Sequence, residues 1–129
     1  MSLCLQFTEG VAFLHQHEVV HCDLKPGNVV VDINSESKTS PRLFIIDFDL
    51  TLSVESEETM SEGRCGTPPW IAPELESRDG PIQRYSPILA DRWACGQMIK
   101  HFPTYEAARK TWLPGFASRL LDVDPRARP

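Results

Sequence analysis

Residues 21–28 read H-C-D-L-K-P-G-N and are followed directly by a run of three valines at 29–31. An aspartate, a lysine and an asparagine within one short turn can orient a hydroxyl, neutralise a phosphate and bind a divalent cation. The β-branched run predicts a short strand, and a second apolar run, L-F-I-I at 43–46, predicts another. We expect these two strands to pair as a hairpin, with the polar turn at one end.

An acidic residue, Asp47, stands immediately after the second apolar run. If the two strands pair, Asp47 lies beside Asn28. Oxygen ligands from an Asp and an Asn suit Mg²⁺, which takes one or two protein ligands and completes its shell with phosphate oxygens and water. The spacing therefore predicts a magnesium site at Asn28 and Asp47.

Helical patterns flank this region on both sides. Apolar residues recur at helical spacing from Leu3 to Leu14, which predicts an amphipathic helix over residues 2–16. Ser86 followed by Pro87 is a helix start, with serine as the N-cap and proline in the first turn. The helix that follows, through Ile99, is apolar nearly all round, and we expect it to be central.

The remaining stretches are less regular. Residues 47–74 are rich in Ser, Thr, Glu, Gly and Pro without a sustained period, which predicts a long irregular surface segment. Near the C-terminus, residues 105–112 and 116–121 are predicted to be two short helical pieces.

Composition narrows the class of protein. The chain has 129 residues, 41% of them hydrophobic, enough for one small domain. A net charge of -5 argues against binding to a nucleic-acid backbone, which requires a basic face. The four cysteines lack C-x-x-C spacing, and no signal peptide or apolar run of about 18 residues is present. These features predict a reduced protein of the cytoplasm or nucleus with no membrane contact.

Five motifs, in order, resemble those of the eukaryotic-type protein kinase family. The catalytic-loop pattern H-R-D-L-K-P-x-N is matched at seven of eight characters by residues 21–28, and D-F recurs at 47–48. G-T-P-P-W-I-A-P-E at 66–74, D-R-W-A-C-G at 91–96 and D-P-R-A-R-P at 124–129 complete the set. The resemblance implies an α+β fold, the large C-terminal lobe of a kinase, mainly helical with a short β-hairpin.

The resemblance also implies roles for the polar residues, with ATP and Mg²⁺ as cofactors and a protein as substrate or partner. Asp23 would accept or orient the substrate hydroxyl proton, and Lys25 would stabilise charge on the transferred phosphoryl group. Asn28 and Asp47 would hold magnesium, and Thr67 would tie the substrate-binding loop to Asp23 and Lys25. The position of Lys25, two residues after Asp23, favours the serine/threonine class.

Four further residues would support this site structurally. His21 is expected to pack and hold the loop backbone rather than act as an acid or base. Asp91 would receive backbone N–H groups of the catalytic loop, and Glu74 and Arg128 would form a partly buried ion pair.

Several features depart from the family pattern. We expect residues 1–129 to be a partial large lobe without the small lobe and the final helix, and an isolated large lobe to bind ATP weakly. Cys22 replaces the arginine that commonly pairs with an activation-loop phosphate. Asp49 stands where D-F-G has glycine, at a cost of about 1–2 kcal/mol if that backbone is left-handed.

Three functions follow as alternatives. One is a serine/threonine kinase-like domain that transfers the ATP γ-phosphate to a protein hydroxyl but is inactive as an isolated fragment. The second is a non-catalytic pseudokinase remnant that binds protein partners. The third is a small-molecule phosphotransferase of the antibiotic or choline kinase type, a class that lacks the L-K-P and A-P-E stretches present here.

A zinc site is a further alternative. Its candidate ligands have a spacing that fits no strong template: His15, His17, His21 and Cys22.

Overall fold

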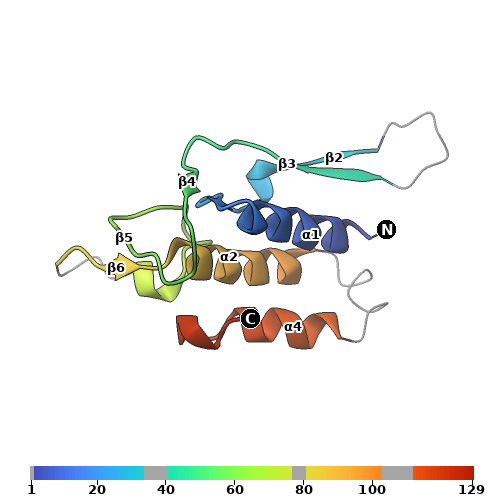
Figure 1. Ribbon diagram of the computed structural model, residues 1–129. Helices are drawn as coiled ribbons and strands as arrows, with labels where there is room; N and C mark the ends of the chain where they lie inside the picture. The colour runs from blue at the N-terminus through green and yellow to red at the C-terminus, as the bar shows by residue number, and fades with distance from the viewer. Residues whose placement is uncertain (1, 34–40, 77–80, 103–111) are drawn as a thin grey trace.

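Helices α1 (Leu3–Gln16), α2 (Pro87–His101) and α4 (Leu113–Leu120) lie side by side and form the body of the molecule, with α2 in the middle (Figure 1). The computed structural model describes residues 2–33, 41–76, 81–102 and 112–129. No helix within these ranges is long and apolar enough to cross a bilayer. The mainly helical architecture with a short hairpin agrees with the fold class expected from the sequence.

Helix α1 forms where the sequence predicts it. The Ser2 hydroxyl accepts a hydrogen bond from Leu5 N at 3.3 Å and so caps the first turn. Phe7 and Val11, from the predicted apolar stripe, are buried together with Cys4. This stripe faces α2, which fixes the orientation of the segment that follows α1.

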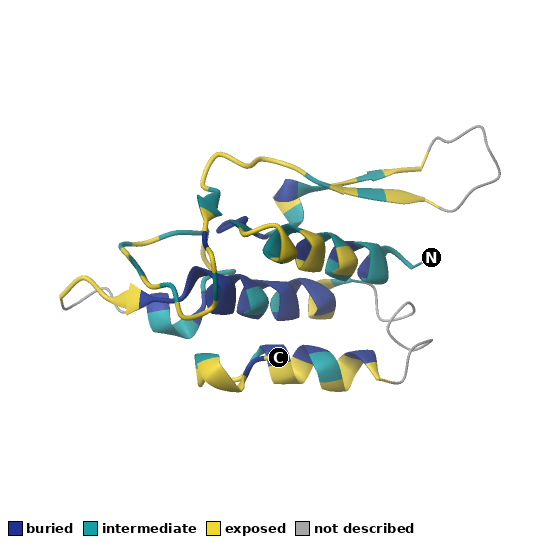
Figure 2. Cartoon of the chain, viewed as in Figure 1, coloured by how far each residue is buried: buried dark blue, intermediate teal, exposed yellow. Residues whose placement is uncertain are grey.

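Helix α2 is the central helix that the sequence predicts. Ser86 accepts a hydrogen bond from Leu89 N at 3.4 Å, and Pro87 occupies the first turn. Almost every side chain of α2 is buried, which Figure 2 shows as a nearly continuous dark blue helix. A helix surrounded on most sides provides a rigid support for polar groups placed on it, above all Asp91.

Helix α4 packs very closely against α2. A Cβ atom added at Gly96 would come within 2.9 Å of Leu120 Cβ, so glycine permits this approach. The helix begins three residues earlier than the predicted start at 116, because Pro114 is tolerated in a first turn. The helical piece predicted at 105–112 lies outside the described residues, except for Trp112, the N-cap of α4.

The predicted hairpin is present. Strand β2 (Val29–Asp32) pairs antiparallel with β3 (Arg42–Ile45), with Val29 opposite Ile45. The pairing continues one step further, because Ile46 N donates to Asn28 O at 2.9 Å. A 3₁₀ turn, η1 (Pro26–Asn28), forms the end of the loop at 21–28 and leads directly into β2. The hairpin packs on α1 and extends past it, away from α2 (Figure 1).

The segment 47–74 is less irregular than predicted. Strand β4 (Leu52–Ser53) pairs with β1 (Val19–Val20), and β5 (Ser61–Glu62) pairs with β6 (Arg84–Tyr85). The segment then ends in the 3₁₀ turn η2 (Pro73–Leu75). Strands of two residues are too short to show an alternating pattern, which is why the sequence contains no signal for them.

Candidate active site

The carboxylate of Asp23 is the centre of a hydrogen-bonded cluster. Thr67 Oγ1 donates to Asp23 Oδ1 at 2.8 Å, and Lys25 Nζ lies 2.9 Å from Asp23 Oδ2. Asn28 Nδ2 donates to the same Oδ2 at 3.1 Å and to the Asp23 carbonyl oxygen at 2.8 Å. The structure thus brings together four residues that the sequence places at the site.

Lys25 closes a triangle in this cluster. Its Nζ donates to Thr67 Oγ1 at 2.8 Å while pairing with Asp23. The triangle joins two parts of the chain, because Asp23 and Lys25 belong to the loop before β2 whereas Thr67 lies more than forty positions later. A carboxylate, an ammonium group and a hydroxyl are therefore held within hydrogen-bonding distance of one another.

The electrostatic balance keeps Asp23 ionised. Burial by itself raises the pKa of its carboxyl, but the hydrogen bonds from Lys25, Thr67 and Asn28 and the positive charge of Lys25 outweigh burial and lower that pKa below its ordinary value. A carboxylate offers about four acceptor sites, and the three side-chain donors of the cluster occupy three of them. One acceptor site remains for a further donor, such as a hydroxyl.

Asp91 on α2 holds the loop at 21–28 in place. Its carboxylate accepts hydrogen bonds from His21 N at 3.1 Å and Cys22 N at 3.0 Å, and lies 3.0 Å from His15 Nε2. Cys22 has a φ of 68°, in the left-handed region that L-residues seldom occupy. The two hydrogen bonds to Asp91 stabilise this turn, which directs the next residue, Asp23, toward Thr67.

His21 is fully buried and links the loop at 21–28 to the end of the hairpin. Its Nδ1 accepts from Asp23 N at 3.2 Å, which places the ring proton on Nε2, where it donates to Ile46 O at 3.0 Å. The imidazole also packs on Phe48, with 5.1 Å between ring centroids. Both ring nitrogens are thus used within the protein, an arrangement suited to positioning backbone.

Asn28 and Asp47 lie at the same end of the hairpin. The amide nitrogen of Asn28 donates to two acceptors on Asp23, so its Oδ1 faces a different direction. Asp47 is exposed, has a φ of 64°, and its Oδ1 accepts a long 3.4 Å hydrogen bond from Asp49 N. An amide oxygen and a carboxylate with spare acceptor capacity fit the oxygen preference of Mg²⁺.

The position of backbone strain differs from the expectation for Asp49. Among the described non-glycine residues, positive φ values occur at Glu18, Cys22 and Asp47, and Asp49 is not one of them. The left-handed conformation thus falls on the first residue of the D-F-D stretch instead of the third. The cost considered for an aspartate in place of glycine at position 49 does not arise.

Glu74 and Arg128 form a bidentate ion pair. Arg128 Nη1 and Nη2 donate to Glu74 Oε1 and Oε2 at 2.6 Å and 2.8 Å. Arg128 also donates to Leu89 O at 2.9 Å and to Asp122 O at 2.8 Å. The pair joins the end of the segment 47–74 to α2 and to the C-terminal turn η3 (Pro125–Ala127).

The residues of the zinc alternative have other partners. His15 contacts Asp91, His17 Nδ1 lies 2.8 Å from Phe13 O, and His21 bonds to Ile46 O. Across the described part of the chain, no group of three or more His, Cys, Asp or Glu side chains is arranged to hold a metal ion.

Two polar contacts of this region were not expected from the sequence. His15 reaches Asp91, 76 positions away, and Tyr85 Oη donates to Cys65 Sγ at 3.1 Å. Neither contact follows from a local pattern, since each joins separate elements.

Comparison with known proteins identifies the family of this chain. The family model described as "Protein kinase domain" matches residues 1–111. The chain is 43% identical to serine/threonine-protein kinase 17A of Oryctolagus cuniculus, over 73% of this chain and 21% of that protein. It is 36% identical to the phosphorylase b kinase gamma catalytic chain, liver/testis isoform, of Homo sapiens, over 98% of this chain and 36% of that protein. The chain thus spans about a third or less of these relatives and belongs to the protein kinase domain family.

Proposed function

We propose that residues 1–129 are the large-lobe part of a serine/threonine protein kinase that transfers the γ-phosphate of ATP to a protein hydroxyl. The observation that carries this proposal is the closed triangle of Asp23, Lys25 and Thr67, with one acceptor site of Asp23 remaining. The serine/threonine assignment is supported by relatives whose names describe serine/threonine kinases.

The geometry suits a direct phosphoryl transfer. The substrate hydroxyl donates to the remaining acceptor site of Asp23, which orients its oxygen toward the γ-phosphorus. A bond forms between that oxygen and phosphorus, while the bond from phosphorus to the bridging oxygen breaks and ADP leaves with its electron pair. The hydroxyl proton passes to Asp23 and then to solvent. The ammonium of Lys25 is held beside Asp23, where the substrate hydroxyl binds. From there Lys25 stabilises negative charge on the transferred group.

Asn28 and Asp47 are the residues we propose to hold magnesium. When bound, Mg²⁺ supplies positive charge that neutralises the phosphates. Asn28 is oriented for this by its two hydrogen bonds to Asp23, so the same interactions that fix the carboxylate also direct the amide oxygen. Lys25 would contact the γ-phosphate, which is the group transferred.

We further propose that this lobe is inactive alone and works with a second lobe that covers the hairpin. Five apolar side chains of the hairpin and of the stretch that follows it are exposed, an unusual concentration for a solvent-facing surface: Val30, Phe44, Ile46, Phe48 and Leu50. They flank Asp47, so a lobe resting on them would also enclose the phosphates and exclude water.

The test is a kinase assay on the full-length protein that contains this chain. Magnesium-dependent transfer from labelled ATP to a protein substrate is expected, and Asp23→Asn is expected to lower kcat by about 10²-fold or more. Asp124→Asn serves as a matched control, because Asp124 is an exposed aspartate that only caps the turn η3. Equal rates for wild type and Asp23→Asn, with both proteins folded, would contradict the proposal.

A pseudokinase that binds protein partners is the second candidate, and two residues favour it. Cys22 cannot pair with a phosphate as arginine does, and Asp49 adds a carboxylate next to the proposed magnesium ligand. Thermal unfolding of the full-length protein separates the candidates, since a ligand that binds the folded state raises Tm. No shift with millimolar ATP and magnesium supports the pseudokinase, whereas a clear shift supports the kinase.

A further inference from the structure

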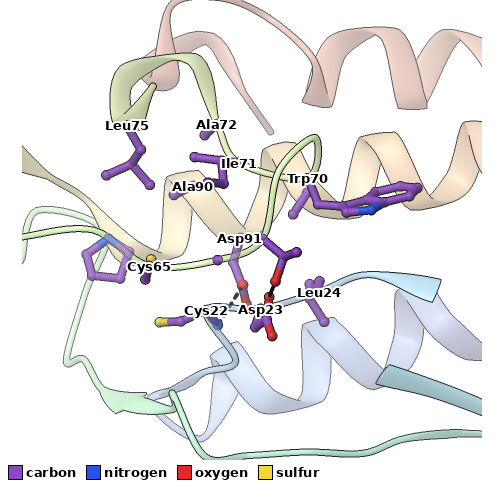
Figure 3. A pocket seen from close by; sticks show the side chains of 14 residues that line it. Cys22, Asp23, Leu24, Cys65, Trp70, Ile71, Ala72, Leu75, Ala90 and Asp91 are labelled. Atoms are coloured by element: carbon purple, nitrogen blue, oxygen red, sulfur yellow. Dashed lines mark hydrogen bonds between the residues drawn. The ribbon is translucent and has the colours of Figure 1, made fainter. Parts of the chain in front are cut away.

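Two cysteines from distant parts of the sequence lie near one another, and one of them, Cys22, belongs to the loop at 21–28. Cys22 and Cys65 line one small cavity of about 20 Å³, and Figure 3 shows their side chains at the same side of it. The backbone confirms the proximity, because a Cβ atom built on Gly66 would lie 3.4 Å from Cys22 O. Both are free thiols, and both contact the apolar cluster around Val54 and Val20.

Cys65 is also reachable from outside the protein. It lines a second, open groove of about 570 Å³ together with Leu50, Arg64 and Pro68, and Cys22 is not among the residues that line this groove. Because Cys65 is half-buried and borders this groove, a small oxidant in the groove can approach the residue without any opening of the fold. Cys22, in contrast, is buried.

The surroundings of Cys65 favour its thiolate. Hydrogen bonds from Cys22 and from Tyr85 lower the pKa of Cys65, and they outweigh the opposing effect of burial. The hydrogen bond to Cys65 together with burial raises the pKa of Cys22, which therefore stays a thiol. The two cysteines thus differ in the way that a nucleophilic and a resolving thiol differ.

The same chain contains a second pair of neighbouring cysteines that lacks these features. Cys4 and Cys95 belong to one buried cluster between α1 and α2, and both are almost completely enclosed. Burial raises the pKa of Cys95 far above its ordinary value. Cys4 is 1% and Cys95 4% exposed, and the pKa of Cys95 is raised whereas that of Cys65 is lowered, so this pair serves as an internal reference.

We propose that Cys22 and Cys65 form a reversible intramolecular disulfide when the protein meets hydrogen peroxide. The Cys65 thiolate attacks one peroxide oxygen, the O–O bond breaks, hydroxide leaves, and Cys65 becomes a sulfenic acid. The Cys22 sulfur then attacks Cys65 Sγ, the S–OH bond breaks, and water forms from that hydroxyl and the Cys22 proton. Two thiol sulfurs are oxidised and one peroxide is reduced to two molecules of water.

This bond would link the two parts of the chain that the Asp23 triangle already joins. Cys22 precedes Asp23 directly, and Cys65 stands two residues before Thr67. The disulfide would add a covalent link beside the hydrogen bond from Thr67 to Asp23, and a dithiol reductant would remove it. The inference concerns thiol chemistry alone and stands whether or not the protein transfers phosphate.

The test is peptide mapping of the full-length protein after brief treatment with hydrogen peroxide under native conditions. We expect a linked peptide that joins Cys22 to Cys65, absent before treatment and lost after incubation with dithiothreitol. Cys4 and Cys95 are expected to remain reduced under the same conditions. No linked Cys22–Cys65 peptide, or a link at Cys4–Cys95 that forms equally fast, would overturn the inference.

Three variants divide the reaction into its steps. Cys65→Ser is expected to abolish oxidation of Cys22, whereas Cys22→Ala is expected to leave a sulfenic acid at Cys65 that dimedone labels. Tyr85→Phe keeps the ring but removes the donated hydrogen bond, and it is expected to slow oxidation of Cys65 by about threefold or more. Matching thermal melts before oxidation show that each variant is folded. Dimedone labelling of Cys22 in Cys65→Ser would contradict the assigned order.

Discussion

Two ion pairs in this molecule use similar groups in different ways. In the pair of Arg128 and Glu74, the arginine side chain is 0% exposed and the carboxylate 17%, and four of the five guanidinium N–H groups have acceptors. In the pair of Lys25 and Asp23, the side chains are 25% and 10% exposed. Lys25 uses two of its three donors, on Asp23 and Thr67.

The difference indicates what each pair is for. A guanidinium that is 0% exposed is out of reach of a ligand, and its contacts bind three separated parts of the chain together. The lysine pair retains one donor and one acceptor within the described residues, so it can bind a phosphate and a hydroxyl without breaking existing contacts. The first pair should therefore matter for stability, and the second for chemistry.

Removal of Arg128 is expected to have the largest effect on stability. Arg128→Ala leaves Glu74 without its cation and removes the donor to Leu89 O, which should lower the free energy of unfolding by about 3–5 kcal/mol. Chemical denaturation measures the change. Arg84→Ala is the matched control, because Arg84 and Glu62 form a long 3.7 Å pair that is about two-thirds exposed. The control should lose less than about 1 kcal/mol, and equal losses would contradict the assigned roles.

Replacement of Asp91 should have an effect on the unfolding free energy between those of Arg128 and Lys25. Like Arg128, Asp91 is buried, but it lies on α2 and supports the loop that carries Asp23. Asp91→Asn turns one acceptor atom into a donor facing backbone N–H groups, and we expect a loss of about 1.5–3 kcal/mol in unfolding free energy. Asp124→Asn, which alters an exposed capping aspartate, should change stability by less than about 0.5 kcal/mol. An Asp91→Asn protein as stable as wild type would show that the loop is held by other contacts.

The helices and the hairpin could be predicted because their signals are local. Ser2 and Ser86 are caps followed by apolar stripes, and the two apolar runs around 29–31 and 43–46 are long enough to identify as strands. The pairing of these strands then brought Asp47 to the Asn28 end of the hairpin by geometry alone. Thr67 was connected with Asp23 only through family resemblance, since no spacing rule reaches across that distance.

The remaining contacts could not be predicted, for physical reasons. The contact of His15 with Asp91 and the meeting of Cys22 with Cys65 join residues dozens of positions apart, where packing of separate elements decides the neighbours. The positive φ of Cys22 follows from the hydrogen bonds of its loop to Asp91. A cysteine side chain does not itself favour this backbone conformation, so the residue type gives no signal for it. Tertiary packing, absent from local patterns, determines these features.

Lys25 is expected to show the smallest effect on stability and so to complete the comparison. Lys25→Met keeps the length of the side chain but removes its charge, and because the group is one-quarter exposed, the unfolding free energy should change by no more than about 1 kcal/mol. Under the proposed function, the same variant should lose about 10²-fold or more of kinase activity in the full-length protein, since no other ammonium group contacts Asp23 among the described residues. Lys100→Met, at an exposed position on α2, is the control for both measurements. A Lys25→Met protein destabilised as strongly as Arg128→Ala would mean that the lysine pair holds the fold together, and the division between the two pairs would fail.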